Sequence, residues 1–330
     1  MKINQFGEFN FIDSIKKNTI FRPEQVVVGI GDDGAVYKTT RGAEQIAVID
    51  TMVEGIHFTR QTMTWWQVGY KVVASNLSDI AAMGGTPTHL VLSVAIPKDM
   101  EVEALHELYE GIKSICRHFG VNIIGGDTVA SLQGLVITVS AFGELRQGRQ
   151  AVTRSGAETG DIIAVTNSIG DAAAGLDALL TATAGFESLK RAHTTPIPMV
   201  LLGEILAQTG ATSMNDISDG LASELNEIAY ASHKELVVDW SHIPVSRELR
   251  IWCEKENKDI RSYVFYGGED YQLVFTMKPK DFHELLKLQL PITKIGVVRS
   301  YTPVGVKVMD NKKENSLEAK GYNHFSEGER

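Results

Sequence analysis

Short apolar runs alternate with longer segments of helical periodicity along the first half of the chain. The short runs are rich in valine and isoleucine, so they predict strands. These predicted strands are Val26–Ile30, Gln45–Asp50, His89–Ile96, Asn122–Ile124 and Leu135–Leu145. Two longer segments, Thr64–Met83 and Glu101–Phe119, carry apolar residues at helical spacing and predict helices. Thr64 and Gln67 fit a capping box at the start of the first of these helices.

The second half continues this alternation with shorter elements. Its predicted strands are Ile162–Thr166, Leu236–Trp240, Asp270–Met277, Ile295–Val298 and Val304–Met309. Its predicted helices are Asp171–Thr183, Met199–Gln208, Leu221–Ser232 and Arg247–Lys258. A polar, turn-rich stretch at 146–161 separates the two halves, so we expect one domain at 1–150 and a second at 151–330. The mixture predicts an α/β chain, of the α+β kind with mixed sheets.

Composition narrows the class of protein. A chain of 330 residues with 43% hydrophobic content is long enough for two cores. The formal net charge of -9, without any basic stripe, argues against nucleic acid and anionic membranes as partners. Residues 1–17 lack the apolar core of a signal peptide, and the longest apolar run, 89–97, is well below the ~20 residues of a transmembrane helix. Cys116 and Cys253 lack metal-type spacing, so we expect core thiols in a cytoplasmic protein.

Glycine or serine followed by an acid recurs after predicted strands. The instances are Gly31-Asp32-Asp33-Gly34, Gly125-Gly126-Asp127-Thr128, Ser218-Asp219-Gly220 and Gly267-Gly268-Glu269-Asp270. Asp50-Thr51 directly follows a predicted strand, and Ser78-Asp79 lies on or near the first predicted helix. A single turn of this kind is ordinary, because aspartate and glycine are common turn residues. The repetition is less ordinary, because exposed turns seldom need acids held by neighbouring glycines.

Carboxylates that converge repel one another. At ~4 Å and an effective dielectric constant of ~20, each pair costs about 4 kcal/mol, so a cluster needs protons or metal ions between its members. Mg²⁺ prefers oxygen ligands and typically binds one or two carboxylates together with substrate phosphates. The acidic turns therefore predict a site for magnesium and a nucleotide.

Other nucleotide-binding patterns fit less well. Gly29–Gly34 satisfies G-x-G-x-x-G after a strand, but its two aspartates would oppose a metal-free pyrophosphate, and Val36-Tyr37-Lys38 does not begin a convincing helix. The chain has no G-x-x-x-x-G-K-[ST] sequence and no protein-kinase signature. A Rossmann, Walker or protein-kinase site is therefore not favoured.

The acidic turns belong to a longer series of motifs that resembles the thiamine-monophosphate kinase family, within the aminoimidazole ribonucleotide synthetase-like superfamily. The series comprises GIGDDGAV (29–36), DTMVEGIHF (50–58), NLSDIAAMGG (76–85), GGDT (125–128), TRSGA (153–157), GDAAAGL (170–176), DISDGL (216–221), GGEDYQLVF (267–275) and GYNHF (321–325). The resemblance implies a two-domain PurM-like architecture, whose N-terminal half dimerises through its sheet and whose C-terminal half closes over the nucleotide. It also implies a homodimer that transfers the γ-phosphoryl group of ATP in line onto thiamine monophosphate.

The resemblance also implies roles for particular residues. Several Mg²⁺ ions would be held by Asp33, Asp50, Asp79, Asp127, Asp216 and Asp219, of which Asp33, Asp127 and Asp219 would be catalytic. ATP would be contacted by Tyr109, Gly126, Asp127, Arg154 and Ser218. Thiamine monophosphate would be contacted by His57, Glu269 and Tyr322.

The absence of an evident general base agrees with a phosphate acceptor. The second pKa of a phosphate monoester is about 6, so the attacking oxygen is mostly ionised at neutral pH. The remaining difficulty is repulsion between two anions, which metal ions and an arginine such as Arg154 would relieve.

One position departs from the family pattern. The family commonly has Ser-Thr before the aspartate at position 50, where this chain has Val48-Ile49, so the metal ligands near Asp50 are in question. Two alternatives stay open: another ATP-using enzyme of the superfamily, such as an aminoimidazole ribonucleotide synthetase, and a catalytically silent nucleotide-binding protein. Selenophosphate synthetase and the hydrogenase-maturation dehydratase are disfavoured, because the cysteines expected near the N-terminus and at the C-terminal end are missing.

Overall fold

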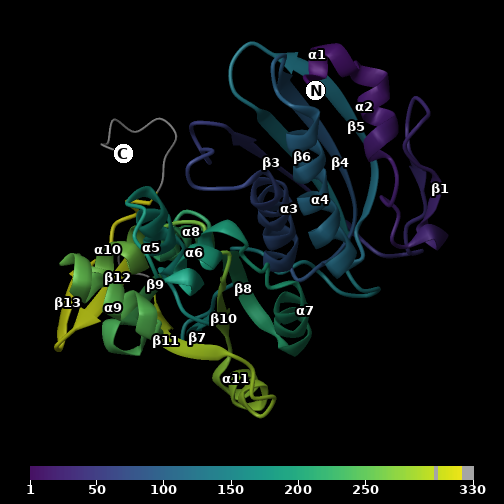
Figure 1. The fold of residues 1–330 in the computed structure, drawn as a ribbon. Coiled ribbons are helices and arrows are strands. Elements are labelled where there is room, and N and C mark those ends of the chain that lie inside the picture. The colour runs from purple at the N-terminus through teal and green to yellow at the C-terminus, as the bar shows by residue number, and fades with distance from the viewer. Residues whose placement is uncertain (301–303, 322–330) are drawn as a thin grey trace. The chain divides into compact units, whose positions relative to one another are not determined.

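The computed structural model describes residues 1–300 and 304–321. Its chain divides into two compact units. The first comprises residues 1–81 and 85–150, and the second comprises 82–84 and the described part of 151–330. Figure 1 shows the first unit in purple to blue and the second in teal to yellow.

The first unit is built on a four-stranded sheet. In spatial order its strands are β3 (Gln45–Val53), β6 (Val136–Glu144), β4 (Thr86–Pro97) and β5 (Asn122–Ser131). β6 pairs antiparallel with both neighbours, whereas β4 and β5 are parallel. The helices α3 (Trp65–Ala82) and α4 (Val102–Phe119) lie against one face of this sheet (Figure 1). The mixed sheet confirms the predicted fold class.

The two faces of this sheet differ in burial. Ile137 and Val139 of β6 point to the helices and are fully buried, as period-two alternation requires. The opposite face carries Thr51 and Thr138, paired across β3 and β6 with their hydroxyl oxygens 2.8 Å apart. Ile49 lies on this face and is 64% exposed. The described part of the first unit therefore leaves much of this face uncovered.

Three short helices and a small hairpin complete the first unit. The helices α1 (Ile3–Phe6), α2 (Glu8–Ile15) and η1 (Pro23–Gln25) were not predicted, because only Phe11 and Ile15 of α2 are buried. The strands β1 (Val26–Val28) and β2 (Val36–Tyr37) form the antiparallel hairpin. The ring of Tyr37 in β2 packs against that of His89 in β4 in a tilted arrangement, with their centroids 4.5 Å apart, and this contact attaches the hairpin to the sheet.

The second unit contains a seven-stranded mixed sheet. In spatial order its strands are β13 (Lys313–Ser316), β12 (Gly305–Asp310), β9 (Glu235–Asp239), β11 (Ile292–Arg299), β7 (Ile162–Thr166), β10 (Leu273–Met277) and β8 (Ala211–Asp216). Only β12 and β9 pair in parallel among these described strands. The predicted strand Asp270–Met277 starts at Leu273 instead, because the preceding residues form a loop.

Helices cover both faces of the central strands of the second sheet. One face packs on α5 (Asp171–Leu180), α6 (Glu187–Thr194), α8 (Leu221–Ser232), α9 (Arg247–Glu256) and α10 (Ile260–Tyr266). The other packs on α7 (Val200–Thr209) and α11 (Pro279–Leu286). Ile163 and Ile162 of β7 belong to these two different cores. This double burial explains why β7 is a continuous apolar run rather than an alternating one.

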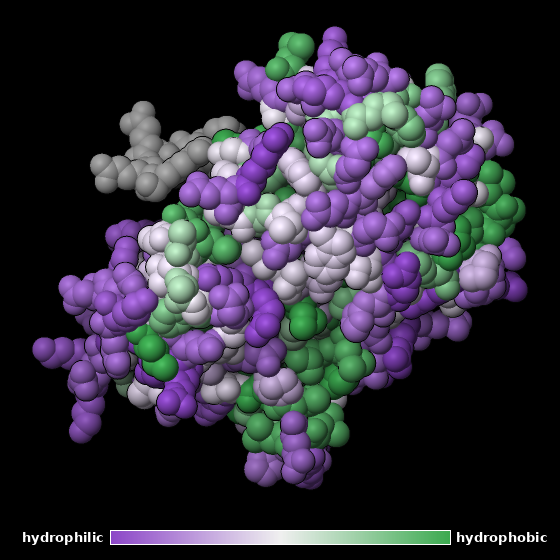
Figure 2. Space-filling view, viewed as in Figure 1, coloured by the Kyte–Doolittle hydropathy of each residue, from purple (hydrophilic) through white to green (hydrophobic). Residues whose placement is uncertain are grey.

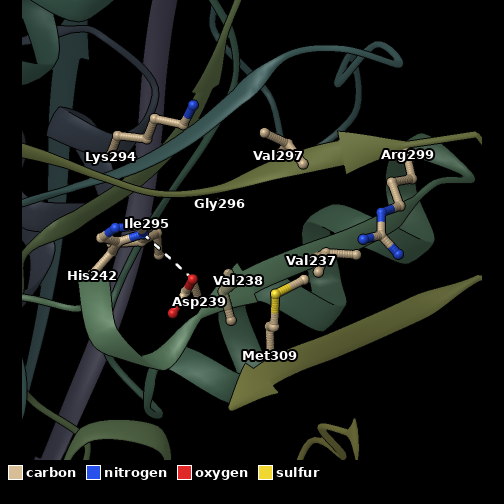
Figure 3. A pocket seen from close by; sticks show the side chains of 10 residues that line it. All are labelled: Val237, Val238, Asp239, His242, Lys294, Ile295, Gly296, Val297, Arg299 and Met309. Carbon is tan, nitrogen blue, oxygen red and sulfur yellow. Dashed lines mark ion pairs between the residues drawn. The ribbon is translucent and has the colours of Figure 1, made fainter. Parts of the chain in front are cut away.

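Apolar surface remains on the second unit. Figure 2 shows hydrophobic side chains over the region of α7 and α11, where Leu201 is 69% exposed and Leu286 is 47% exposed. A hollow of about 200 Å³ is lined by residues of β9, β11 and β12 and of the short helix η2 (Trp240–His242), as Figure 3 shows. Val237, Val297 and Met309 point into this hollow, and none of the predicted site residues lines it.

Candidate functional site

Two loops of the second unit are joined by their backbones. The first loop, 217–220, connects β8 to α8, and the second, 267–272, connects α10 to β10. The amide of Glu269 donates to the carbonyl oxygen of Ser218 at 2.7 Å, and the amide of Tyr271 donates to that of Ile217 at 2.9 Å. The structure therefore brings together a residue predicted to bind ATP, Ser218, and one predicted to bind substrate, Glu269.

The second loop has an unusual backbone. Glu269 and Tyr271 both have positive φ angles, 66° and 50°, which side-chain-bearing residues seldom adopt. Strain of this kind persists only where the surroundings enforce it, and it is common at functional sites. Gly268 cannot be replaced easily, because a Cβ there would lie 2.4 Å from the carbonyl oxygen of Ser218. The glycine of this motif thus permits the close approach of the two loops.

Asp270 attaches the second loop to the start of α5. Its carboxylate accepts hydrogen bonds from the amides of Gly170 at 2.6 Å and Ala172 at 3.0 Å. An acid is favourable there, because the N-terminus of a helix carries partial positive charge. Burial nevertheless raises the pKa of Asp270 to about 7 and outweighs these two donors. Asp270 therefore has a structural role, since its hydrogen bonds hold the loop against the start of α5.

Three polar residues that sequence reasoning missed lie behind the first loop. Glu224 of α8 is 2% exposed, and its Oε1 accepts from the amide of Asp219 at 3.0 Å. Asn215 donates its side-chain amide to Glu224 and, at 2.9 Å, to Oε2 of Glu227. The only signal in the sequence is a pair of acids three residues apart at the start of a helix, and this pattern is common on solvent-exposed helices.

The electrostatics behind this loop favour a cation. Burial raises the pKa of Glu224 to about 9, and the carboxylates of Asp216, Glu227 and Asp219 add to the rise. Such a group is stabilised as an anion only when positive charge enters the site. Oxygen donors of this kind suit a hard cation such as Mg²⁺. The second unit therefore supplies oxygen donors of the kind that Mg²⁺ prefers, although its described residues form no group of three that could hold the ion.

Arg154 is held along one edge by this network. Its Nε lies 3.1 Å from Oδ1 of Asn215 and 3.0 Å from Oε2 of Glu227. The side chain is 56% exposed, and its two terminal nitrogens bond no other described residue. An arginine fixed at Nε and open at its terminal nitrogens can bind a phosphate through both of them.

The acidic motifs of the first unit are not all turns. Gly125–Thr128 lies inside β5 and Asp50 lies inside β3, so the prediction that these acids follow strands was wrong. The strands continue because β5 pairs with β4 up to Ser131 and β3 pairs with β6 up to Val53. Strand pairing supplies the hydrogen bonds that a short motif cannot reveal.

Cross-strand pairing separates two of these acids. Asp127 pairs with Ser93, which lies on the uncovered face with Thr138, and Asp127 is exposed. Asp50 points to the other face, where its carboxylate bonds the hydroxyl of Ser75 in α3. Burial raises the pKa of Asp50, and the Ser75 hydrogen bond opposes that rise. The two carboxylates therefore leave the sheet from opposite faces.

The remaining acids of the first unit occupy a loop and a helix. Asp33 is exposed in the loop between β1 and β2, and its amide donates to Oδ1 of Asp32 at 2.9 Å. Asp79 lies in α3. The departure at Val48-Ile49 is divided between the two faces of β3, since Val48 shares the face of Asp50 and Ile49 points away from it.

No group of three His, Cys, Asp or Glu side chains among residues 1–300 and 304–321 is close enough to hold one metal ion. Four predicted ligands, Asp33, Asp50, Asp79 and Asp127, belong to the first unit, whereas Asp216 and Asp219 belong to the second. Neither unit by itself therefore assembles the predicted set of metal ligands.

The predicted substrate and nucleotide contacts differ in accessibility. His57 follows β3, and its Nδ1 accepts from the amide of Val53 at 3.0 Å, so a neutral ring carries its hydrogen on Nε2. Tyr109 of α4 is 5% exposed and packs edge-on against Phe11, as a core aromatic does. Gly126 lies in β5, where a Cβ would meet the carbonyl oxygen of Leu92 at 2.3 Å.

Tyr322 lies outside the described residues. Gly321, the residue before it, is close to the first loop of the second unit, since a Cβ at this position would lie 2.0 Å from the carbonyl oxygen of Asp219. The C-terminal motif therefore reaches the Ser218–Asp219 turn at Gly321.

Among the described residues, none of the helices has the length and apolar composition needed to cross a bilayer.

Comparisons with known proteins extend along nearly the whole chain. Residues 31–145 match the family model of the AIR synthase related protein N-terminal domain, and residues 158–307 match that of its C-terminal domain. The chain is 40% identical to the thiamine-monophosphate kinase of Bacillus subtilis, and the match covers 96% of this chain and 99% of that relative.

Solved structures give the same picture. The crystal structure of thiamine-monophosphate kinase from Stenotrophomonas maltophilia is similar with a TM-score of 0.81 and 31% identity, covering 95% of this chain and 98% of that one. A structure of AaThiL complexed with AMPPCP and TMP is similar with a TM-score of 0.78 and 32% identity, covering 98% and 99% of the two chains. The similarity therefore includes both units and is not confined to one domain.

Proposed function

Because the chain belongs to the thiamine-monophosphate kinase family, we propose that it transfers the γ-phosphoryl group of ATP to thiamine monophosphate, giving thiamine diphosphate. The observation that carries the proposal is the 40% identity to the kinase of Bacillus subtilis over nearly the full length of both chains. The backbone contact between Ser218 and Glu269 supports it, because nucleotide and substrate must meet for direct transfer.

The proposed transfer is in line and needs no general base. The acceptor is a phosphate oxygen that is mostly ionised at neutral pH, since its second pKa is about 6. Repulsion between two anions is then the main barrier, and positive charge at fixed positions lowers it. Arg154 suits this role, because its Nε is held by Asn215 and Glu227 while its terminal nitrogens bond no other described residue.

The aspartates of both units would bind magnesium in this reaction. The proposed ligands are Asp33, Asp50, Asp79, Asp127, Asp216 and Asp219. Mg²⁺ bound there would neutralise phosphate charge. The raised pKa of Glu224 is consistent with this assignment: burial is its main cause, and the carboxylates of Asp216, Glu227 and Asp219 add to the rise. Tyr109, Gly126 and Ser218 stay predicted ATP contacts.

The proposed substrate contacts have complementary chemistry. His57 would donate from Nε2 to an acceptor atom of thiamine monophosphate, because its Nδ1 is already an acceptor for Val53. Glu269 would lie near the positive charge of the thiazolium ring, which a carboxylate attracts. Tyr322 stays a predicted third contact.

We further propose a homodimer formed through the uncovered face of the first sheet. This face carries Ile49, which is 64% exposed, and Val129, which is 45% exposed. Burying such residues is favourable by about 25 cal/mol per Å² of apolar surface.

Cys116 and Cys253 are free and buried, which supports a reducing, cytoplasmic location.

The test is incubation of the purified chain with MgATP and thiamine monophosphate, following thiamine diphosphate and ADP. We expect stoichiometric formation of both. MgATP binding without thiamine diphosphate would instead favour the silent nucleotide-binding protein. Turnover with an aminoimidazole ribonucleotide synthetase substrate, but not with thiamine monophosphate, would favour another enzyme of the superfamily.

Asp127→Asn provides the residue-level test of the metal assignment. The variant replaces a carboxylate by an isosteric amide, so we expect turnover to fall by a factor of about 100 or more, as for lost electrostatic stabilisation of a transition state. Asp127 is exposed in β5, so the thermal unfolding temperature should be unchanged. Near-normal turnover would contradict a metal role for Asp127.

A further inference from the structure

We propose that His193 is a positioning residue that orients the carboxylate of Glu269 toward the cationic part of the substrate; this inference rests on the proposed function. Nδ1 of His193 lies 3.3 Å from Oε2 of Glu269. A carboxylate oxygen only accepts hydrogen bonds, so His193 would donate to it from a hydrogen on Nδ1. His193 is 1% exposed, whereas the side chain of Glu269 is 27% exposed. The histidine is therefore behind the carboxylate, on its buried side.

The position of His193 is set by the packing of α6 on α5. Gly175 of α5 permits this packing, because a Cβ there would lie 2.0 Å from the carbonyl oxygen of Leu189 in α6. The two helix backbones thus touch, and His193 follows Leu189 by one helical turn. Any side chain larger than hydrogen at position 175 would displace α6 and His193 with it.

The position of Glu269 is set by the same helix. Asp270, the next residue, binds the amides of Gly170 and Ala172 at the start of α5. α5 is therefore the common support of both partners, through Gly175 for His193 and through Asp270 for Glu269. The packing of α6 on α5 at Gly175 and the hydrogen bonds of Asp270 to the start of α5 place His193 and Glu269 next to each other. The approach of Nδ1 to Oε2 therefore follows from the fold.

The backbone of Glu269 is fixed, but its side chain needs a further contact to fix the position of its carboxylate. Its φ of 66° lies in the left-handed region, and its amide is bonded to the carbonyl oxygen of Ser218. This fixes where the side chain starts but not where its carboxylate ends, because three side-chain torsions follow. A contact at Oε2 restricts those torsions before substrate binds, so the contact lowers the entropy cost of substrate binding.

If His193 had only a structural role, its replacement would have different effects. It would affect stability and all kinetic constants together, whereas a positioning residue affects mainly the affinity for the substrate that Glu269 contacts. Asparagine and glutamine separate the two cases, because the amide nitrogen of His193→Asn lies near the former Nδ1 and that of His193→Gln lies near the former Nε2.

The experiment compares the full-length wild type, His193→Asn and His193→Gln in the thiamine diphosphate assay. We expect His193→Gln to raise KM for thiamine monophosphate about tenfold, the size of one lost hydrogen bond to a charged group. KM for MgATP and kcat should change by less than about threefold. His193→Asn should restore KM for thiamine monophosphate to near the wild-type value.

The matched control is Glu269→Gln. In this background His193→Gln should add no further rise in KM, because the charged partner is already lost. Equal KM values for the two His193 variants, or a parallel loss of KM, kcat and unfolding temperature, would overturn the positioning role. A wild type that forms no thiamine diphosphate would overturn the proposed function itself, and so is a distinct outcome.

Should both His193 variants fail to fold, the wild-type chain still provides a test. The ¹⁵N resonance of His193 Nδ1 should shift between the wild type and Glu269→Gln, since the hydrogen-bond acceptor changes from a carboxylate to an amide. An unchanged resonance would contradict the contact on which the proposal stands.

Discussion

At the scale of single residues, His89 shows a titratable side chain buried outside the candidate site. It is 1% exposed, its ring packs against that of Tyr37 in a tilted arrangement, and neither ring nitrogen has a hydrogen-bond partner among the residues that the structure describes. Burial lowers its pKa below the ordinary 6.5, Glu144 opposes that shift, and Arg22 adds to it. The folded chain therefore holds His89 neutral where the unfolded chain is already taking up a proton.

This pKa makes stability depend on pH. The contribution of neutral His89 is fully present above the unfolded pKa and is lost as pH falls from that value through the folded one. His89→Phe keeps an aromatic ring beside Tyr37 but cannot titrate. We expect wild type to lose more unfolding free energy than His89→Phe between pH 7.5 and pH 5, measured by urea denaturation at about 25 °C. Parallel losses in the two proteins would contradict this expectation.

Residue-scale reasoning from the sequence identified the acids but not their surroundings. Asp216, Ser218, Asp219 and Glu269 belong to motifs. Ser218, Asp219 and Glu269 lie in the two joined loops, and Asp216 directly precedes the first of them. Asn215 and Glu224 were missed, because a polar residue in a polar strand and an acid at a helix start are both common on protein surfaces. Their burial depends on contacts that no local pattern encodes.

At the scale of elements, α3 and α4 cross at two glycines. A Cβ at Gly111 would lie 1.9 Å from the carbonyl oxygen of Trp66, and one at Gly69 would lie 1.9 Å from that of Leu108. The helices therefore meet backbone to backbone. Helix propensity alone would place alanine at both positions.

Gly111→Ala tests this crossing. Alanine favours an isolated helix by about 1 kcal/mol over glycine, yet the clash with Trp66 should destabilise the chain by roughly 1–3 kcal/mol or more. The control is Gly34→Ala, because a Cβ at Gly34 meets nothing within 4 Å. Urea denaturation should show a lower midpoint for Gly111→Ala only. Equal midpoints for the two variants would show that the helices can separate without cost.

Elements were predicted best where one periodicity dominated the sequence. The amphipathic α4 was predicted to within one residue, and β7 was predicted in full. β8 and α6 were missed because Ala211–Asp216 is polar and Glu187–Thr194 carries few apolar residues. β8 is nevertheless stable as a strand, since it pairs with β10 along its length. Pairing between distant segments can thus outweigh weak local propensity.

At the scale of the whole molecule, the uncovered face of the first sheet is the candidate surface for association. Ile49→Lys would place a charge on this face, in its edge strand β3. We expect the wild type to sediment as a dimer and Ile49→Lys as a monomer in analytical ultracentrifugation, because burying an unpaired charge is costly.

The matched control is Ile251→Lys, in α9 of the second unit, where isoleucine is 42% exposed. This variant should remain dimeric. A wild type that is monomeric at micromolar concentration, or loss of the dimer in both variants, would contradict association through the sheet face.

The sequence by itself determined the α/β class, the main strands and helices, and the oxygen-rich chemistry of the acidic motifs, because periodicity and residue type are local properties. Only the tertiary structure decided that β3 and β5 continue through Asp50 and Asp127, since strand length depends on a pairing partner. It also decided that the loops of Ser218 and Glu269 join and that His193 lies behind Glu269. These contacts link residues far apart in the chain, and no periodicity within either segment specifies them.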